Sequence, residues 1–255
     1  YLIGDRARNG SVVNLAGEIT STGNDIKGKT INVTGDTVVN ASTNLNAINS
    51  ININGALSVS GNNRLISLTH ATTGTDGLSF GNSGKISMPG SSIRYRVNNN
   101  YYTLIKTLAD LQAIGSNATT LAGQYVLAND IDASSTATTS FNPIGSSSTT
   151  GFSGVMDGLG NSINNLTVNK PIKDEVGLIG FNQFGSLKNI VLINAAVTGQ
   201  NYVGGLIGRN GLDNGTHGSS VISGNRVSGT VTGKQYVGGL VGGNRRNPVR
   251  AGPGQ

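Results

Sequence analysis

The chain has 255 residues, of which 12% are charged and 5% aromatic, with no cysteine and no tryptophan. The lack of cysteine excludes disulfides and thiolate metal sites, and no run of 18 apolar residues could form a membrane-spanning helix. The net charge is +6, but Arg245, Arg246 and Arg250 in the last eleven residues supply half of it, so no clustered basic patch indicates nucleic-acid binding.

The first hundred residues consist of short segments in which apolar and polar side chains alternate. Such segments occur at residues 11–15, 30–33, 48–53 and 56–59, and Gly, Asn and Asp punctuate them. Alternation of this kind predicts β-strands separated by turns.

A phosphate-binding loop is the first functional motif that the sequence suggests. Residues 23–30, GNDIKGKT, match G-x-x-x-x-G-K-[ST], which holds nucleotide phosphates only where a helix begins at the Lys-Thr pair. Residues 31–40 instead alternate β-branched and polar side chains, which indicates a strand. We therefore predict that the chain binds no nucleotide and that residues 23–30 form a polar turn between two strands.

One short helix is expected near residues 107–114. Thr107 and Asp110 have the spacing of a capping box in front of residues 108–114, and Gly115 follows as the stop signal. A helix of two turns must pack on other elements to be stable.

The clearest internal signal is a repeat near the end of the chain. Residues 197–210, VTGQNYVGGLIGRN, recur as residues 231–244, VTGKQYVGGLVGGN, with ten of fourteen positions identical. A shorter copy, VGLIGFN, precedes both at residues 176–182. Periods of about 20 to 50 residues are typical of solenoids, whose units bury their apolar faces against their neighbours.

Each recurring type of residue in the repeat has a structural role in this interpretation. The branched apolar pair fills the interior, the glycines allow tight corners or close approach, and the final Asn stacks on its equivalent one coil away. The repeat positions are Tyr202, Gly204, Gly205, Leu206, Gly208, Asn210, Tyr236, Gly238, Gly239, Leu240, Gly242 and Asn244.

Residues 101–171 contain an ordered series of segments that resembles a known module. The series is YTLI at 102–105, TLADLQAI at 107–114, YVLANDIDAS at 125–134, FNPIG at 141–145 and FSGVMDGLGNSINNLTV at 152–168. It resembles filamentous-haemagglutinin-like adhesins of the two-partner secretion type, and the later repeats resemble the GLUG motif found beside that module. Together the two resemblances cover about residues 101–244.

The resemblance implies a right-handed parallel β-helix, export through a β-barrel partner in the bacterial outer membrane, and a role in attachment or biofilm formation. It supplies no catalytic residues. A secretion-targeting domain and a C-terminal anchoring region are not evident, so we expect an interior piece of a longer fibre.

The predicted fold is therefore all-β, a single right-handed parallel β-helix with one short helix and coils of about 20 to 25 residues. We divide the chain into N-terminal coils (1–100), the haemagglutinin-like module (101–172), GLUG-type coils (173–244) and a linker or disordered tail (245–255). The side chains expected to point inward are Leu45, Ile53, Val59, Val168, Leu178, Ile190, Leu206 and Leu240.

Three acidic residues give an alternative function, because β-helices also house polysaccharide lyases and hydrolases that use paired carboxylates. Asp130 and Asp132 alternate onto one face of a strand, and Asp157 could join them from the next coil. The simpler interpretation is that Asp157 begins a turn with its following glycine and that the other two cap loop amides. No basic residue lies between Lys106 and Lys170 to stabilise an enolate, so we expect no enzyme activity.

The two histidines, His70 and His217, lie in polar surroundings. Asp213 precedes His217 by four residues, a spacing that aligns two ligands only on a helix, and the intervening Asn-Gly disfavours one. We therefore predict no metal site, no catalytic triad and no cofactor.

These observations favour a secreted or bacterial cell-surface adhesin or fibre segment. Its partners would be a carbohydrate or protein receptor of a host or matrix, and the outer-membrane secretion barrel. It would contain no integral membrane segment and bind no nucleic acid. The alternative is a β-helical polysaccharide lyase or hydrolase acting through Asp130, Asp132 and Asp157.

Overall fold

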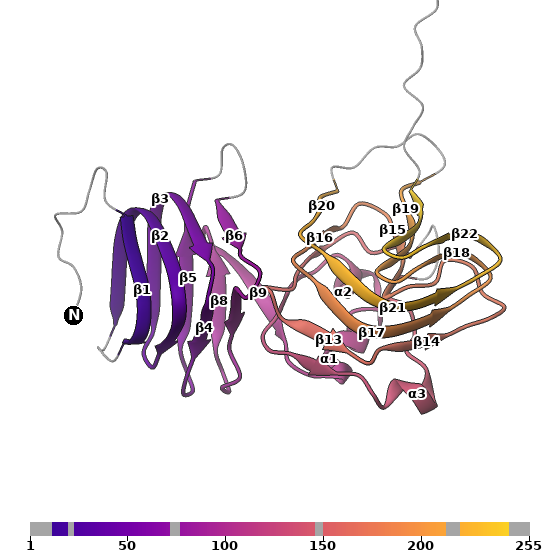
Figure 1. Cartoon of the computed structure of the whole chain (residues 1–255), viewed down its shortest axis with the longest axis horizontal. Helices are drawn as coiled ribbons and strands as arrows, with labels where there is room; N and C mark the ends of the chain where they lie inside the picture. The colour runs from indigo at the N-terminus through magenta and orange to yellow at the C-terminus, as the bar shows by residue number, and fades with distance from the viewer. Residues whose placement is uncertain (1–11, 20–22, 72–76, 146–149, 213–219, 245–255) are drawn as a thin grey trace, which may run out of the picture.

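The computed structural model describes residues 12–19, 23–71, 77–145, 150–212 and 220–244. These ranges contain 23 strands and three short helices, which confirms the prediction of an all-β protein. Figure 1 shows two stacks of strands arranged side by side along the long axis of the molecule. We call residues 12–97 the N-terminal stack and residues 103–244 the C-terminal stack.

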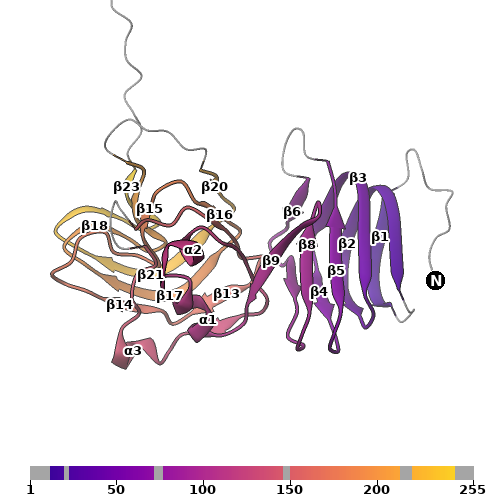
Figure 2. The same cartoon turned by 180° about the vertical axis from the view of Figure 1, so that it is seen from behind.

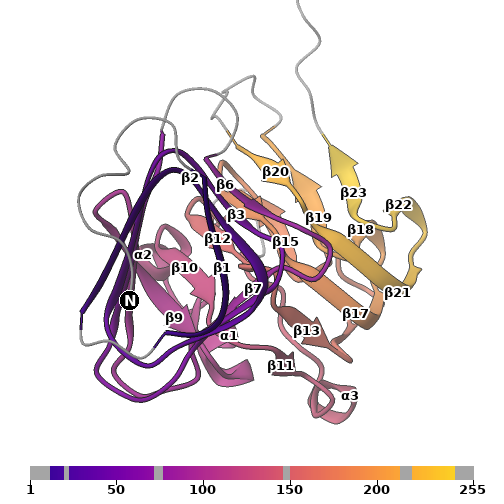
Figure 3. The ribbon, with the colours of Figure 1, turned by 60° about the vertical axis from the view of Figure 1, so that its left-hand side comes forward.

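Parallel pairing builds the N-terminal stack, and the spacing between paired residues grows from 18 at Val12–Thr30 to 29 at Leu65–Arg94. Asn14 pairs with Asn32 and Asn32 with Asn52, so successive coils are 18 and 20 residues long. Figure 3 shows these coils one behind another. The strands are β1 (Val12–Ile19), β2 (Asn24–Val39), β3 (Thr43–Ile53), β4 (Ala56–Val59), β5 (Leu65–Thr69), β6 (Leu78–Phe80), β7 (Lys85–Ser87) and β8 (Arg94–Val97).

The segment GNDIKGKT does not form the turn that we predicted between two strands. Residues 24–30 lie inside β2, and Asn24, Ile26 and Gly28 alternate inward along it. The register against β3 shifts between Gly28 and Thr30, so an irregularity within the strand replaces a turn. A strand, and no helix, follows the Lys-Thr pair, so the helix start that a phosphate-binding loop requires is missing at this place.

In the C-terminal stack the spacing between paired residues ranges from 22 at Thr103–Tyr125 to 35 at Leu187–Ile222. Asn182 pairs with Asn210 and Asn210 with Asn244, which gives coils of 28 and 34 residues. Both are longer than the coils predicted from the sequence. The first strands are β9 (Asn100–Ile105), β10 (Gln124–Leu127), β11 (Ile131–Asp132), β12 (Val155–Asp157), β13 (Ser162–Asn164), β14 (Thr167–Asn169), β15 (Ile179–Asn182) and β16 (Ser186–Lys188). They are followed by β17 (Val191–Thr198), β18 (Asn201–Gly204), β19 (Ile207–Asn210), β20 (Ile222–Ser223), β21 (Arg226–Thr232), β22 (Gln235–Gly238) and β23 (Val241–Asn244).

The predicted helix is confirmed as α1 (Leu108–Ala113). Thr107 accepts a hydrogen bond from the Asp110 N–H, and the Asp110 carboxylate accepts one from the Thr107 N–H, which completes the capping box. Two further helices, α2 (Ala118–Leu121) and α3 (Thr136–Thr139), were not predicted. A capping box at Asn117, with Thr120 in place of the usual Glu, starts α2.

Buried apolar side chains fall into two clusters, one for each stack, where we expected one uninterrupted solenoid. Leu45, Ile53, Val59, Val168, Leu178, Ile190 and Leu206 are all buried, as predicted. Leu240 is only partly buried, because it lies in the last described coil and no described coil covers its outer side.

The two stacks meet at a hairpin between β8 and β9. It is the single antiparallel strand pair among the described residues, and Asn98 and Asn99 form its two-residue turn with φ of 47° and 66°. Positive φ at both central positions is the requirement of a type I′ turn, which Asn tolerates. β9 then runs obliquely from the N-terminal to the C-terminal stack, as Figure 2 shows from behind.

Backbone contacts reinforce this junction. The Ile86 N–H donates to the Leu159 carbonyl at 2.9 Å, and the buried Asn161 amide donates to the carbonyls of Ile86 and Leu127 at 2.7 and 2.9 Å. Val126 and Leu159 of the C-terminal stack complete the apolar core of the N-terminal stack. The stacks therefore share a packed interface.

The handedness of the coils and the division at residues 100 and 172 remain predictions, and the tail at 245–255 lies outside the described residues. In the described ranges no helix is both long and apolar enough to cross a membrane.

Candidate functional site

Residues at equivalent positions of the sequence repeat pair with one another in neighbouring parallel strands. Val203 of β18 pairs with Val237 of β22, and Asn210 of β19 pairs with Asn244 of β23, each pair being 34 residues apart. The shorter copy joins at the same face, because Asn182 pairs with Asn210, 28 residues on. Equivalent residues of the repeat are therefore stacked on one another.

The final Asn of each copy forms the ladder predicted from the sequence. The Asn182 amide donates to the Asn210 side-chain carbonyl at 2.7 Å, and the Asn210 amide donates to that of Asn244 at 2.9 Å. Asn182 is fully buried, whereas Asn244 is exposed. The ladder therefore runs from the core toward solvent.

Replacing Asn210 with alanine should lower the free energy of unfolding by about 1–3 kcal/mol, because the buried Asn182 amide loses one of its two hydrogen-bond acceptors. Thermal and urea denaturation of the purified chain measure the change. Asn244→Ala is the matched control and should cost only a few tenths of a kcal/mol, since its partner Asn210 is nearer solvent. Equal losses in both variants would contradict a ladder anchored in the core.

Tyr202 and Tyr236 also stack, which was not predicted from the sequence. Their rings are 4.6 Å apart and inclined by 6°, and both residues have φ of 54°. Glu175 takes the corresponding place in the shorter copy, also with positive φ, and accepts a hydrogen bond from Arg209 at 2.9 Å. The Arg209 guanidinium lies 5.5 Å from the Tyr202 ring, so an ion pair and a ring stack continue along one face.

Most repeat glycines lie against neighbouring backbone, as predicted. An added Cβ would lie 2.1 to 2.5 Å from a backbone atom at four positions, Gly204, Gly208, Gly238 and Gly242. At Gly205 it would meet the Val227 side chain at 2.5 Å. Gly239, in the last described coil, has open space around it and does not need to be glycine on this ground.

Asp130 and Asp132 serve loop hydrogen bonds. Asp130 accepts from the Ser162 N–H at 2.8 Å and from Lys85 at 3.1 Å. Burial alone would raise the pKa of Asp130, but the bonds from Ser162 and Lys85 outweigh it and the pKa is lowered. The hydroxyl and N–H of Ser134 lower the pKa of Asp132. A general acid needs a raised pKa, so neither residue has the property that this role requires.

Asp157 lies on β12, which belongs to a different sheet from β11 with its Asp132. It accepts from the Leu159 N–H at 2.9 Å, as the predicted turn requires, and from the Asn189 amide at 3.0 Å. In the described part of the chain no three His, Cys, Asp or Glu residues are grouped to hold a metal ion, so the three aspartates do not form such a group.

A basic residue does reach these carboxylates, so the absence of one between Lys106 and Lys170 is no argument against a lyase. The interval between Lys106 and Lys170 contains none, yet Lys85 reaches Asp130 from the other stack, 45 residues away. Lys188 likewise lies in the same pocket as Asp157. The stacking of coils brings residues of distant segments together. The residues around a site therefore cannot be identified from one interval of the sequence.

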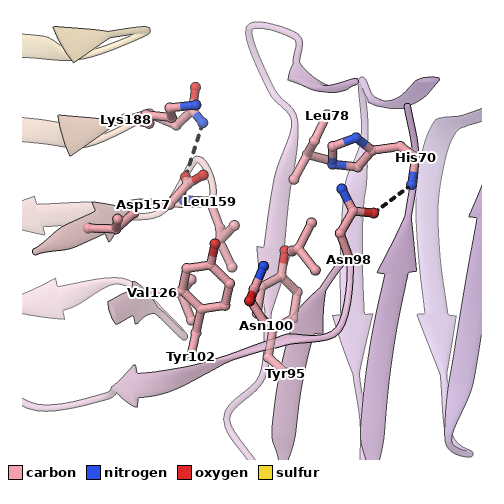
Figure 4. A pocket seen from close by; sticks show the side chains of 13 residues that line it. His70, Leu78, Tyr95, Asn98, Asn100, Tyr102, Val126, Asp157, Leu159 and Lys188 are labelled. Carbon is pink, nitrogen blue, oxygen red and sulfur yellow. Dashed lines mark hydrogen bonds between the residues drawn. The ribbon is translucent and has the colours of Figure 1, made fainter. Parts of the chain in front are cut away.

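The described residues contain a pocket of about 220 Å³ at the junction of the stacks. Figure 4 shows Tyr95 and Tyr102 with their hydroxyls pointing into it from adjacent strands, Asp157 and Lys188 on one side, and His70 and Asn98 on the other. The remaining lining residues are Leu78, Val97, Asn100, Val126, Val155, Leu159 and Asn189.

The two tyrosines form the cross-strand pair of the β8–β9 hairpin. Their rings are 5.9 Å apart at an angle of 61°. Burial, and then the charge of Asp157, raise the pKa of both phenols, so each is a neutral hydrogen-bond donor at neutral pH. His70 at the rim bonds the Ala71 carbonyl through Nδ1 at 2.8 Å. His217 and Asp213 lie outside the described residues.

This pocket was not predicted from the sequence, although part of its signal was present. Residues 94–102 read RYRVNNNYY, in which a pair of Asn between strand-forming residues marks a hairpin. Nothing in the sequence indicated that residues 157 and 188 would close the pocket from the other stack.

Comparison with known proteins gives one partial likeness. No family model and no solved structure matches the chain. Halomucin of Haloquadratum walsbyi is 40% identical over 109 residues, which is 42% of this chain and 1% of halomucin. The chain therefore corresponds to a small part of that protein, and neither the haemagglutinin-like module nor the GLUG motif is supported by a family match.

Proposed function

We propose that this chain is a segment of a secreted or cell-surface protein that mediates attachment through a parallel β-helix. The observation that carries the proposal is the stacking of repeated side chains in register, Asn182 on Asn210 on Asn244 and Tyr202 on Tyr236. The repeated register places equivalent side chains at one edge of successive coils, and its exposed members, Tyr236 and Asn244, can contact an extended receptor.

Two further observations support this proposal. Parallel pairing between successive coils runs through both stacks, as a parallel β-helix of either hand requires, and the similar stretch of halomucin favours a surface or secreted location. Carbohydrate or a protein of a host or matrix would be the receptor. Export through an outer-membrane β-barrel, and a bacterial origin, rest on the resemblance to haemagglutinin-like adhesins alone.

We also propose that the chain is not an enzyme. The lowered pKa values of Asp130 and Asp132 support this, because the general acid of a glycosidase needs a raised pKa. The polysaccharide lyase or hydrolase remains the alternative.

A glycan array read first for binding and then for cleavage tests both proposals. We expect binding without product. Product that disappears in Asp130→Asn or Asp157→Asn, but not in the surface control Asp25→Asn, would overturn the adhesin in favour of the enzyme. Asp25 is a suitable control because it pairs with Lys27 at the surface, away from the pocket. If the array shows neither binding nor product, attachment to carbohydrate is wrong and a spacer remains.

A further inference from the structure

The junction pocket contains an unexplained polar group. Tyr95 is fully buried, and its hydroxyl has no hydrogen-bond partner among the residues that the structure describes. Leaving a buried hydroxyl unpaired costs about 1–3 kcal/mol. Because this hydroxyl points into the pocket, a ligand with an acceptor oxygen would satisfy it (Figure 4).

The lining favours an uncharged ligand with many hydroxyls. Asp157 and Lys188 both face the pocket, so their formal charges offset each other. The side-chain amides of Asn98, Asn100 and Asn189 add donors and acceptors, as hydroxyl groups require. The Tyr102 ring, with Leu78 and Val126, gives the apolar surface on which the C–H face of a sugar ring packs.

The size of the pocket limits the ligand to about one ring. Its volume of about 220 Å³ is below the roughly 300–1,000 Å³ of sites that hold drug-sized molecules. The position matters as well, because the walls come from both stacks and the pocket exists only when the two are docked.

We infer that this pocket binds a single ring of a neutral saccharide, with Tyr95 donating a hydrogen bond to a ring substituent. The inference rests on the proposed attachment function, for which it names one receptor chemistry and one site. Burial and the nearby Asp157 carboxylate raise the pKa of Tyr95, so it remains a donor throughout the neutral pH range.

The test is titration of the whole chain with a panel of monosaccharides, followed by calorimetry and saturation-transfer NMR. The panel holds glucose, galactose, mannose and N-acetylglucosamine, with galacturonate and glucosamine as charged counterparts. We expect at least one neutral sugar to bind. Tyr95→Phe removes only the hydroxyl and should weaken that binding at least tenfold, while the melting temperature stays equal or rises because a buried unpaired group is lost.

Tyr101→Phe is the matched control, since Tyr101 lies next to Tyr102 in the chain but is 52% exposed and does not line the pocket. Its affinity should equal that of the unmodified chain. The inference is overturned if no neutral sugar binds, if Tyr95→Phe binds as tightly as the unmodified chain, or if only the charged sugars bind.

The same variants separate this inference from the proposed function. Suppose that the Tyr95→Phe variant still binds the glycan array and that monosaccharides do not compete. The receptor contact then lies elsewhere, so the inference about the pocket is wrong and the proposed attachment function stands. Monosaccharide binding lost in Tyr95→Phe, with an array that stays silent, would leave the pocket correct and attachment wrong.

Discussion

Replacing Leu206 with aspartate should lower the free energy of unfolding by at least about 3 kcal/mol. Leu206 has no exposed surface and belongs to the core cluster of the C-terminal stack. Its N–H donates to the Leu240 carbonyl at 3.0 Å and its carbonyl accepts from the Ile179 N–H at 2.8 Å, so a coil lies on each side of it. A carboxylate there would lie within the apolar core. Urea denaturation followed by circular dichroism measures the loss.

Leu240→Asp is the informative partner variant. The sequence predicted that both leucines point inward, but Leu240 is only partly buried, so a carboxylate there can reach water and the loss should be smaller. Leu206→Asp with an unchanged unfolding free energy would show that this residue is not interior.

Replacing Gly160 with alanine should cost more than about 4 kcal/mol, which is exceptional for the addition of one methyl group. Gly160 has φ of +77°, and an added Cβ would lie 2.0 Å from the carbonyl oxygen of Gly84 in the N-terminal stack. The carbonyl oxygen of Gly84 belongs to the backbone and cannot turn aside as a flexible side chain could. The two stacks would therefore have to separate at the junction. Urea denaturation measures this loss too.

Gly17→Ala isolates this steric contribution. Gly17 also has positive φ, +83°, but no atom of the described chain lies within 4 Å of an added Cβ. Gly17→Ala should lower the free energy of unfolding only by the conformational penalty of roughly 1–2 kcal/mol. Similar unfolding free energies for the two variants would contradict close contact between the stacks at Gly160.

Features that depend on neighbouring or repeated residues could be predicted from the sequence. The repeat predicted the register of β18 with β22 and the Asn210–Asn244 rung, because identical residues stack best on one another. The capping box at Thr107 predicted α1, since all its hydrogen bonds are local.

Features that depend on contacts between distant segments could not. The Asn161 amide binds the Ile86 carbonyl, 75 residues away, and Lys85 binds Asp130, 45 residues away, yet neither pair has a pattern that links its members. The division into two cores and the pocket between them follow from such contacts. The strand through residues 24–30 was missed for a related reason, because alternating burial overrides the turn preference of its glycine and asparagine residues.

The β8–β9 hairpin also matters for how fast the chain can fold. The parallel strand pairs of the described residues join successive coils, so each must close a long loop before any contact forms. The hairpin needs only the two-residue turn at Asn98 and Asn99, and such hairpins form in about 1–10 μs. Pairing there loses the least chain entropy. Folding that starts at the hairpin would extend outward in both directions, with the sugar-sized pocket assembled near the origin and the ladder at Asn244 completed last.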